Sequence, residues 1–219
     1  AVSKLFELGC PLVILACNTA SAKALRTIQQ INLPVIDATR RVLGVIRPTA
    51  ECIGEITRSR HVGILATAGT IKSESYLLEI HKLSPDIVVT GEACPMWVSL
   101  VENNEYQSEG ADYFVKQHIN RLLDKDPMID TIILGCTHYP LLLDKIRQFT
   151  PGHIRIIAQG EYVARSLQDY LNRHPEMDAR CEKGGKCRFL TTESENKFEE
   201  SASIFLGRQD IKVESIALE

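Results

Sequence analysis

Short apolar runs alternate with longer stretches of helical periodicity along the whole chain. The short runs predict buried strands, and apolar residues three or four positions apart predict amphipathic helices between them. The predicted strands are Leu12–Ala16, Pro34–Ala38, Val62–Thr67, Ile87–Thr90, Thr131–Gly135, Ile154–Ala158, Arg188–Thr191 and Ile211–Ile216. The predicted helices are Ser21–Gln30, Arg41–Thr57, Ser73–Lys82, Gly110–Leu123, Leu141–Phe149, Glu161–Asn172 and Asn196–Leu206. This alternation is typical of the α/β class with a mainly parallel sheet.

Two of the predicted strands end in the same way. Leu12–Ala16 leads into Cys17, and Thr131–Gly135 leads into Cys136. Each thiol is followed by polar residues and a predicted helix, at the carboxyl end of a strand, where open α/β sheets place their ligands. The repeat therefore predicts two thiols presented to one site.

The spacing of this repeat predicts how the chain is divided. The two cysteines lie 119 residues apart, which is about the length of one doubly wound domain. We therefore expect two similar doubly wound, mainly parallel-sheet domains with the active site in the cleft between them. The first domain would comprise residues 1–45 and 160–219, and the second residues 46–159.

Composition and charge narrow the class of protein. The chain has 219 residues, 44% of them hydrophobic and 24% charged, as in ordinary globular proteins. Its formal charge of -3 offers no electrostatic footprint for nucleic acid, so we expect no nucleic-acid partner. Its apolar runs are far shorter than the roughly 20 residues that cross a bilayer, so we expect no membrane partner. Seven cysteines without a disulfide framework indicate a reducing compartment, the cytoplasm.

The two strand-end cysteines suit a particular kind of proton transfer. At a strand-to-helix turn, main-chain N–H groups and the positive end of the helix stabilise a thiolate, so we expect Cys17 and Cys136 to be activated. A thiolate on one face of a carbon acid and a thiol on the other can remove one proton and deliver another, which inverts the centre. Disulfide exchange is the competing thiol chemistry, but no Cys-x-x-Cys pair is present.

Metal and cofactor chemistry find less support. Zinc sites usually need clustered Cys and His ligands, and neither thiol has such a neighbour, so we expect no metal. Cys181 and Cys187 bracket the loop 182–186, a spacing that suits a surface turn, and we assign them no role. No glycine-rich nucleotide motif or pyridoxal lysine signature stands out, so we expect no cofactor.

The cysteine segments carry a family resemblance. Ala16–Ala20 and Gly135–Leu142 resemble the two signature segments of the glutamate racemases, the cofactor-independent enzymes of the aspartate/glutamate racemase superfamily. Further segments similar to that family are Gly63–Ser73, Ala93–Pro95, Leu100–Glu102, Phe189–Thr192 and Phe205–Gly207. The resemblance spans practically the whole chain.

The resemblance implies racemisation of L-glutamate and D-glutamate, which supplies D-glutamate for peptidoglycan. It implies a catalytic set of Cys17, Cys136, Glu102 and His138, and a substrate-binding set of Asn18, Thr19, Thr67, Thr70, Thr137 and His138. Taken from the residues alone, Glu102 would be a solvated loop acid. Thr67 and Thr70 would by default be turn-stabilising hydroxyls.

The chain also departs from the family pattern. Family members begin with a strand ending in Asp-Ser-Gly, followed later by a Tyr-Gly segment, and neither occurs here. We therefore expect the N-terminal part of the protein to be missing from this sequence. The alternatives are a racemase for another amino acid such as aspartate, and a non-catalytic amino-acid-binding homologue. A homodimer is an open alternative for the assembly.

Overall fold

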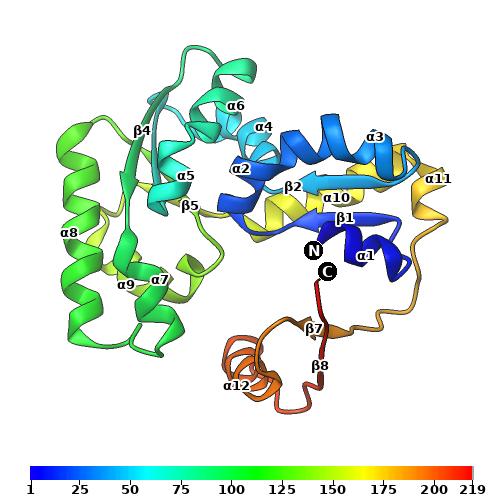
Figure 1. Cartoon of the computed structure of the whole chain (residues 1–219). Helices are drawn as coiled ribbons and strands as arrows, with labels where there is room; N and C mark the ends of the chain where they lie inside the picture. Colours follow the sequence, from blue (N-terminus) through cyan, green and yellow to red (C-terminus); the bar gives the residue numbers. More distant parts are fainter. Residues whose placement is uncertain (219) are drawn as a thin grey trace.

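The computed structural model describes residues 1–218 and has two main parallel sheets (Figure 1). The larger sheet has the strand order β4-β3-β5-β6, and all its strands are parallel. Its strands are β3 (His61–Ala66), β4 (Val88–Ala93), β5 (Thr131–Gly135) and β6 (Arg155–Ala158). The predicted α/β class with parallel sheets is confirmed.

Helices cover both faces of this sheet because its strands are apolar on both sides. In β5, Ile132 and Leu134 face a core shared with α7 (Pro95–Glu102), α8 (Glu109–Lys125) and α9 (Leu143–Phe149). Ile133 faces the opposite core, which includes residues of α4 (Ile46–Ile56) and α6 (Ser75–Leu83). Successive side chains of a strand alternate between faces, so one continuous apolar run serves two cores.

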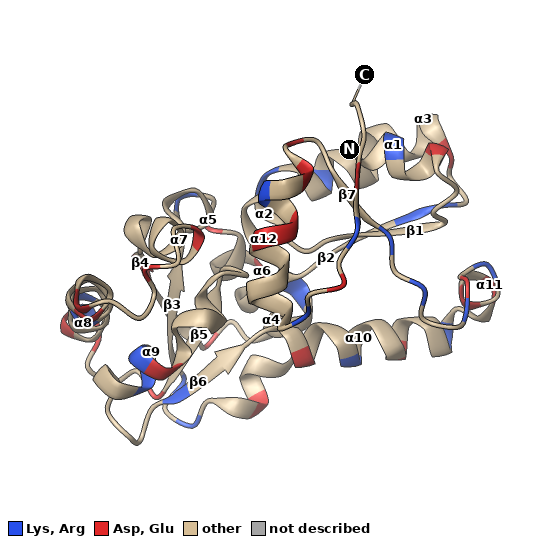
Figure 2. Ribbon diagram, turned by 90° about the horizontal axis from the view of Figure 1, so that it is seen from below, with Lys and Arg blue, Asp and Glu red and all other residues tan. Residues whose placement is uncertain are grey.

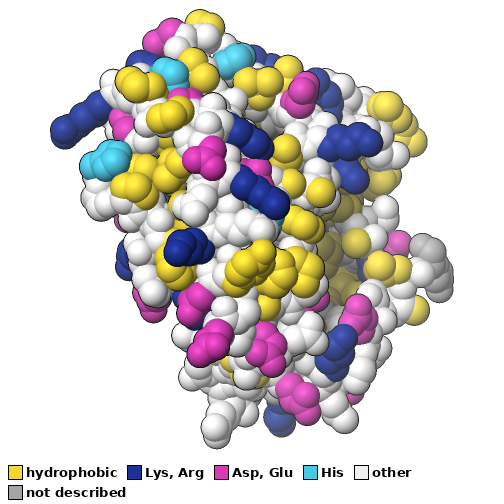
Figure 3. All heavy atoms as spheres, turned by 90° about the vertical axis from the view of Figure 1, so that its left-hand side faces the viewer, with side chains coloured by type: hydrophobic (Ala, Val, Ile, Leu, Met, Phe, Trp, Pro, Cys, Tyr) yellow, Lys and Arg dark blue, Asp and Glu magenta, His cyan; other side chains and the backbone are white. Residues whose placement is uncertain are grey.

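The outermost helix of this layer, α8, carries its charge on one side. Ser108 caps it by accepting a hydrogen bond from the Ala111 main-chain N–H, and Val115, Ile119 and Leu122 are buried beneath it. Figure 3 shows the side of the molecule on which α8 lies in Figure 1, and charged side chains of both signs are interspersed there. The helix is thus amphipathic, as its sequence periodicity predicts.

The smaller parallel sheet pairs β1 (Leu12–Leu15) with β2 (Arg41–Gly44). Among residues 1–218, no strand pairs with the other edge of β1, and only Val13 of this strand is fully buried. Around the pair lie α1 (Val2–Glu7), α2 (Asn18–Thr27), a π-helical segment (Ile28–Asn32) and α3 (Leu33–Ile36). The strand predicted at 12–16 is thus present as β1, with one edge paired to β2 and the other edge unpaired in the described part of the chain.

The sequence assignment was also wrong between residues 34 and 45. Pro34–Ala38 is not a strand, because residues 34–36 belong to α3, and the strand lies later, at Arg41–Gly44. Val42 in that strand is 1% exposed and pairs with Val13, whereas Val35 is 85% exposed. Both runs contain apolar residues, but the residues of 41–44 include a buried valine whereas the valine of 34–38 is exposed. The following helix consequently begins at Ile46 and not at Arg41.

The C-terminal part leaves the larger sheet through α10 (Gly160–Arg173), which leads past β2 to α11 (Pro175–Asp178) (Figure 2). Beyond it, β7 (Phe189–Thr191) and β8 (Val213–Ser215) pair with each other in parallel. Between them lies α12 (Glu195–Leu206), which shares a small core with the two strands. The remaining short helices are α5 (Ala68–Lys72) and the 3₁₀ turn η2 (Tyr139–Leu142).

Candidate active site

The predicted site residues gather where parallel strands end and the next helix begins. Cys17 is the residue before α2, Thr67 the residue before α5, and His138 the residue before η2. Ala66 pairs with Gly135 in the register of β3 and β5, so Thr67 and Cys136 leave the sheet side by side. Their placement follows from the sheet, because parallel strands all end at the same edge.

The two thiols lie near one another but in different environments. Cys17 is exposed, whereas Cys136 is 8% exposed. Burial raises the pKa of the Cys136 thiol; the main-chain N–H of His138 lowers it by less, and the nearby Cys17 and Glu102 raise it further. The N–H groups of the turn lower the pKa of Cys136 as expected, but removal from water outweighs them, so the expected activation of Cys136 is wrong for this structure. Cys136 is held as a neutral thiol.

The buried thiol of Cys136 contacts the His138 imidazole, which in turn contacts the carboxylate of Glu102. The Nδ1 atom of His138 lies 3.7 Å from Sγ of Cys136, and its Nε2 lies 3.2 Å from a carboxylate oxygen of Glu102. Glu102 is the last residue of α7, a helix that the sequence reading did not include. The carboxylate is thus not a free loop acid. Because the imidazole can shuttle a proton between its two nitrogens, the three groups form a relay that can reset Cys136.

Three threonine hydroxyls form a second cluster beside Cys17. Thr19 Oγ1 lies 2.8 Å from Thr67 Oγ1 and 3.1 Å from Thr70 Oγ1, and the last two lie 3.1 Å apart. Thr67 also accepts a hydrogen bond from the main-chain N–H of Thr70, so it caps α5. Hydroxyls that share protons with each other can turn those protons toward a bound anion.

Asn18, the residue after Cys17, is 2% exposed and makes one side-chain hydrogen bond. Its Oδ1 accepts from the Tyr76 hydroxyl at 2.7 Å, while its Nδ2 is buried with no partner. A buried donor without a partner costs about 1–3 kcal/mol, which a ligand oxygen would recover. The amide therefore has an NH₂ group that is free to donate to an acceptor.

Of the residues still to be placed, Thr137 belongs to the predicted binding set, whereas Cys181 and Cys187 were assigned no role. Thr137 is exposed beside Cys136. Cys181 is half-buried, and Cys187 is exposed and donates to the Gly185 carbonyl, in a turn where Gly184 and Gly185 both have positive φ. Across residues 1–218, no three His, Cys, Asp or Glu side chains are grouped to hold a metal ion.

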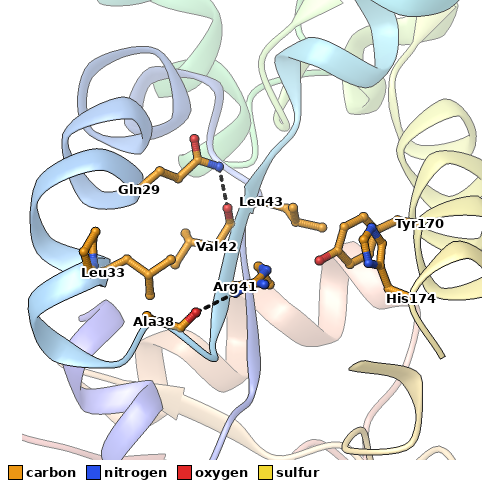
Figure 4. Close-up of a pocket in the computed structure, with 9 residues that line it drawn as sticks. Gln29, Leu33, Ala38, Arg41, Val42, Leu43, Tyr170 and His174 are labelled. Atoms are coloured by element: carbon orange, nitrogen blue, oxygen red, sulfur yellow. Dashed lines mark hydrogen bonds between the residues drawn. The ribbon is translucent and has the colours of Figure 1, made fainter. Parts of the chain in front are cut away.

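A pocket of about 460 Å³ lies away from this chemistry (Figure 4). It opens between α3, the start of β2 and the end of α10, with Arg41, Tyr170 and His174 in its wall. Arg41 pairs with Leu12 at the amino end of β1, the end opposite to Cys17. The pocket contains none of the predicted site residues, and we assign it no part in the reaction.

The sequence did not predict the buried hydrogen-bonded residues that support the site. Tyr76 and Gln159 form a buried hydrogen-bonded pair behind Asn18, and the Tyr139 hydroxyl donates to the Cys94 carbonyl at the start of α7. The partners are 83 and 45 residues apart in sequence. No local pattern marks such pairs, although a Tyr in an otherwise apolar helix face is a hint that a hydroxyl needs a partner.

Within residues 1–218, no helix is long and apolar enough to cross a membrane.

Known proteins resemble this chain over most of its length. A family model described as Asp/Glu/Hydantoin racemase matches residues 1–167. A glutamate racemase of Ruegeria sp. (strain TM1040) is 36% identical over an alignment that covers 95% of this chain and 78% of that protein.

Solved structures agree with this similarity. The crystal structure of a glutamate racemase from Bacillus anthracis has a TM-score of 0.88 and 34% identity, and covers 99% of this chain and 77% of that one. The glutamate racemase from Francisella tularensis in complex with D-glutamate has a TM-score of 0.83 and 27% identity, with 99% and 77% covered. By its match to the family model and by its relatives, this chain belongs to the Asp/Glu/Hydantoin racemase family.

Proposed function

We propose that this protein interconverts L-glutamate and D-glutamate through two thiols that act on opposite faces of the Cα atom. The single observation that carries the proposal is the meeting of Cys17 and Cys136, one exposed and one buried as a neutral thiol, at the ends of two strands. The names of the similar proteins, glutamate racemases, support the choice of substrate.

The chemistry needs one base and one acid at a time. A thiolate at Cys17 removes the Cα proton from one face of the substrate, and the Cys136 thiol delivers its proton to the other face of the resulting carbanion. The product has the opposite configuration, and the two cysteines have exchanged protonation states. For the reverse reaction, Cys136 is the base and Cys17 the acid.

His138 and Glu102 serve the Cys136 side of this cycle. Once Cys136 has given up its proton, a protonated His138 stabilises the thiolate, and Glu102 stabilises the imidazolium through its 3.2 Å contact. Cys17 has no such relay among the described residues and instead faces solvent. The two half-reactions therefore depend on different groups.

The polar cluster beside Cys17 provides the donors for a substrate carboxylate. The free Nδ2 of Asn18 and the hydroxyls of Thr19, Thr67 and Thr70 all lie at the N-termini of α2 and α5, where anions are favoured. Hydrogen bonds to the carboxylate also acidify the neighbouring Cα–H, because they stabilise the charge that develops there. We include Thr137 in the binding set because of its position after Cys136.

Several wider features belong to the same proposal. The chain divides into one domain of residues 1–45 and 160–219 and another of residues 46–159, with the reaction in the cleft between them. D-glutamate made here would enter peptidoglycan. Seven free thiols support a reducing cytoplasmic location. The exposed apolar side chains Ile31, Val35 and Ile36 are the surface that we propose for a homodimer.

Deuterium incorporation tests the two-base reaction directly. In deuterated water, the product enantiomer should carry deuterium at Cα from the first turnovers, while recovered starting enantiomer stays unlabelled, because separate thiols serve the two faces. Cys17→Ala and Cys136→Ala should each abolish turnover, and Cys187→Ser, an exposed thiol in the remote turn, is the matched control. Equal early labelling of both enantiomers, or turnover in either alanine variant, would contradict the mechanism. Aspartate assayed in parallel checks the choice of substrate.

A further inference from the structure

Tyr76 is a buried phenol that touches the segments of both thiols. Its hydroxyl donates to Oδ1 of Asn18, the residue after Cys17. Its ring packs against Gly135, the residue before Cys136, so closely that a Cβ on that glycine would lie 3.2 Å from the Tyr76 ring. Tyr76 is 4% exposed and stands on α6, whereas Asn18 stands on α2. One side chain therefore braces both halves of the proposed site.

Gln159, the residue before α10, completes this contact from behind. Its Nε2 lies 2.6 Å from the Tyr76 hydroxyl, 3.0 Å from the Thr49 hydroxyl and 3.2 Å from the Val45 main-chain carbonyl. Val45 and Gln159 lie where the chain crosses between the two domains that we propose. All of these groups are buried, so water cannot replace any of the bonds.

The Val45 carbonyl fixes which group donates in the series of hydrogen bonds that runs through Gln159 and Tyr76 to Asn18. A carbonyl oxygen can only accept, so the amide of Gln159 must turn its NH₂ group toward Val45. The second of its two protons is shared between the Tyr76 hydroxyl at 2.6 Å and the Thr49 hydroxyl at 3.0 Å, and because an amide nitrogen cannot accept, both hydroxyl oxygens accept from it. The Tyr76 hydroxyl then accepts from Gln159 and has a single proton left, which goes to Asn18. Since the amide of Asn18 receives that proton on Oδ1, its Nδ2 donor is the atom left over.

From this chain of donors we infer that Tyr76 and Gln159 are positioning residues that fix the orientation of the Asn18 amide. They hold the amide so that Nδ2, and not Oδ1, is presented to a substrate carboxylate beside Cys17. An unfixed asparagine could turn its oxygen toward the same anion, which would repel it. The inference rests on the proposed function for the identity of the anion but not for the geometry of the amide.

The matching test is Tyr76→Phe, which keeps the ring against Gly135 and removes only the hydroxyl. Without the phenol proton the Asn18 amide can flip, so KM for both glutamate enantiomers should rise about tenfold while kcat changes much less. Gln159→Glu is the second variant, because a carboxylate would accept the Tyr76 proton and reverse the chain, and it should raise KM at least as much. Thr150→Val, which removes a buried hydroxyl bond to the Ile146 carbonyl in α9, is the stability control and should leave KM unchanged.

A double-mutant cycle separates positioning from a merely structural role. If Tyr76 acts through Asn18, then Tyr76→Phe should cause no further rise in KM in an Asn18→Ala background. Additive effects in the cycle, or an unchanged KM in Tyr76→Phe, would overturn the inference while leaving racemisation by the wild type intact. If instead the wild type does not turn over glutamate, the proposed function fails, and the same cycle read from urea unfolding midpoints tests the bond. If the shifts in unfolding midpoint of Tyr76→Phe and Asn18→Ala are not additive, the hydrogen bond that fixes the Asn18 amide is supported. If the shifts are additive, the inference is refuted.

Discussion

The Nε2 atom of His138 lies 3.2 Å from the carboxylate of Glu102, although the two residues come from different connections of the sheet. Glu102 ends α7 after β4, and His138 follows β5. The Glu102 side chain is 60% exposed, so the pair itself stabilises the fold little. Its value lies in holding the imidazole toward Cys136.

Removing the carboxylate tests that role. Glu102→Gln should lower kcat by about 10- to 100-fold with a smaller effect on KM, because the imidazolium that supports the Cys136 thiolate loses its counter-charge. Steady-state racemisation measured by chiral chromatography gives both constants. Glu105→Gln, an exposed acid just beyond α7, is the control. An unchanged kcat in Glu102→Gln would show that the pair has no part in the reaction.

The hydroxyl cluster can be tested at Thr67. Thr67→Val keeps the shape but removes the oxygen that meets Thr19 and Thr70, so KM for glutamate should rise about tenfold, and the lost α5 cap should cost about 1 kcal/mol of stability. Thr67→Ser, which keeps the hydroxyl, should retain most of the affinity. Equal KM values in the Val and Ser variants would exclude this hydroxyl as a substrate donor.

The unequal burial of the two thiols predicts unequal reactivity. Burial raises the pKa of Cys136 above the usual thiol value, so its thiolate fraction is small at neutral pH and grows only as the pH rises beyond the ordinary thiol range. Iodoacetamide labelling followed by peptide mass spectrometry should therefore modify exposed Cys17 first at pH 7, with Cys136 catching up under alkaline conditions. Faster labelling of Cys136 at pH 7 would contradict this order.

Acid stability should depend on Asp130, at the amino end of β5. Its carboxylate accepts hydrogen bonds from the Thr57 hydroxyl and the Arg58 and Ser59 main-chain N–H groups, at 2.6–2.7 Å, and from Thr131. Burial opposes ionisation, but these donors together hold the pKa of Asp130 well below its usual range. A depressed folded-state pKa gives stability that is present above the unfolded pKa of about 3.9 and is lost as the pH falls below it.

Asp130→Asn should therefore lower the free energy of unfolding by about 2 kcal/mol at pH 7 and weaken its dependence on acid pH. Urea unfolding at pH 7 and at about pH 3, below the unfolded pKa, measures both effects. Asp124→Asn, an exposed aspartate of α8, is the matched control and should change neither. If Asp130→Asn is as stable as the wild type at pH 7, the carboxylate is not an anchor for this loop.

Residues that carry a strong local signal were predictable from the sequence. β5 is one example, because its residues Ile132–Leu134 form a continuous apolar run and both faces of the strand are buried. The strand-end positions of Cys17 and Cys136 followed from the same signal. The run 34–38 failed because its apolar residues are exposed on a short helix, and exposure is decided by neighbours far away in the sequence.

The buried hydrogen bonds that support the site could not be predicted from local sequence patterns for the same reason. Asn18 and Tyr76 are 58 residues apart, and their bond exists only because α2 and α6 are brought together by separate strands. The pKa of Cys136 was misjudged because the turn was visible in the sequence and the depth of burial was not. Periodicity reports which face of an element is apolar, but not which buried polar groups meet.

The larger sheet keeps its anchor and its chemistry at opposite ends of one strand. Asp130 precedes β5 and accepts hydrogen bonds from the loop before β3, whereas Cys136 follows β5 and lies 3.7 Å from His138. The two sites are separated by about 20 Å of backbone, since Cys136 follows Asp130 by six residues and a strand rises about 3.3 Å per residue. Under the proposed function, exchanging loops at the carboxyl edge would change the substrate groups while leaving the Asp130 hydrogen bonds at the amino edge untouched.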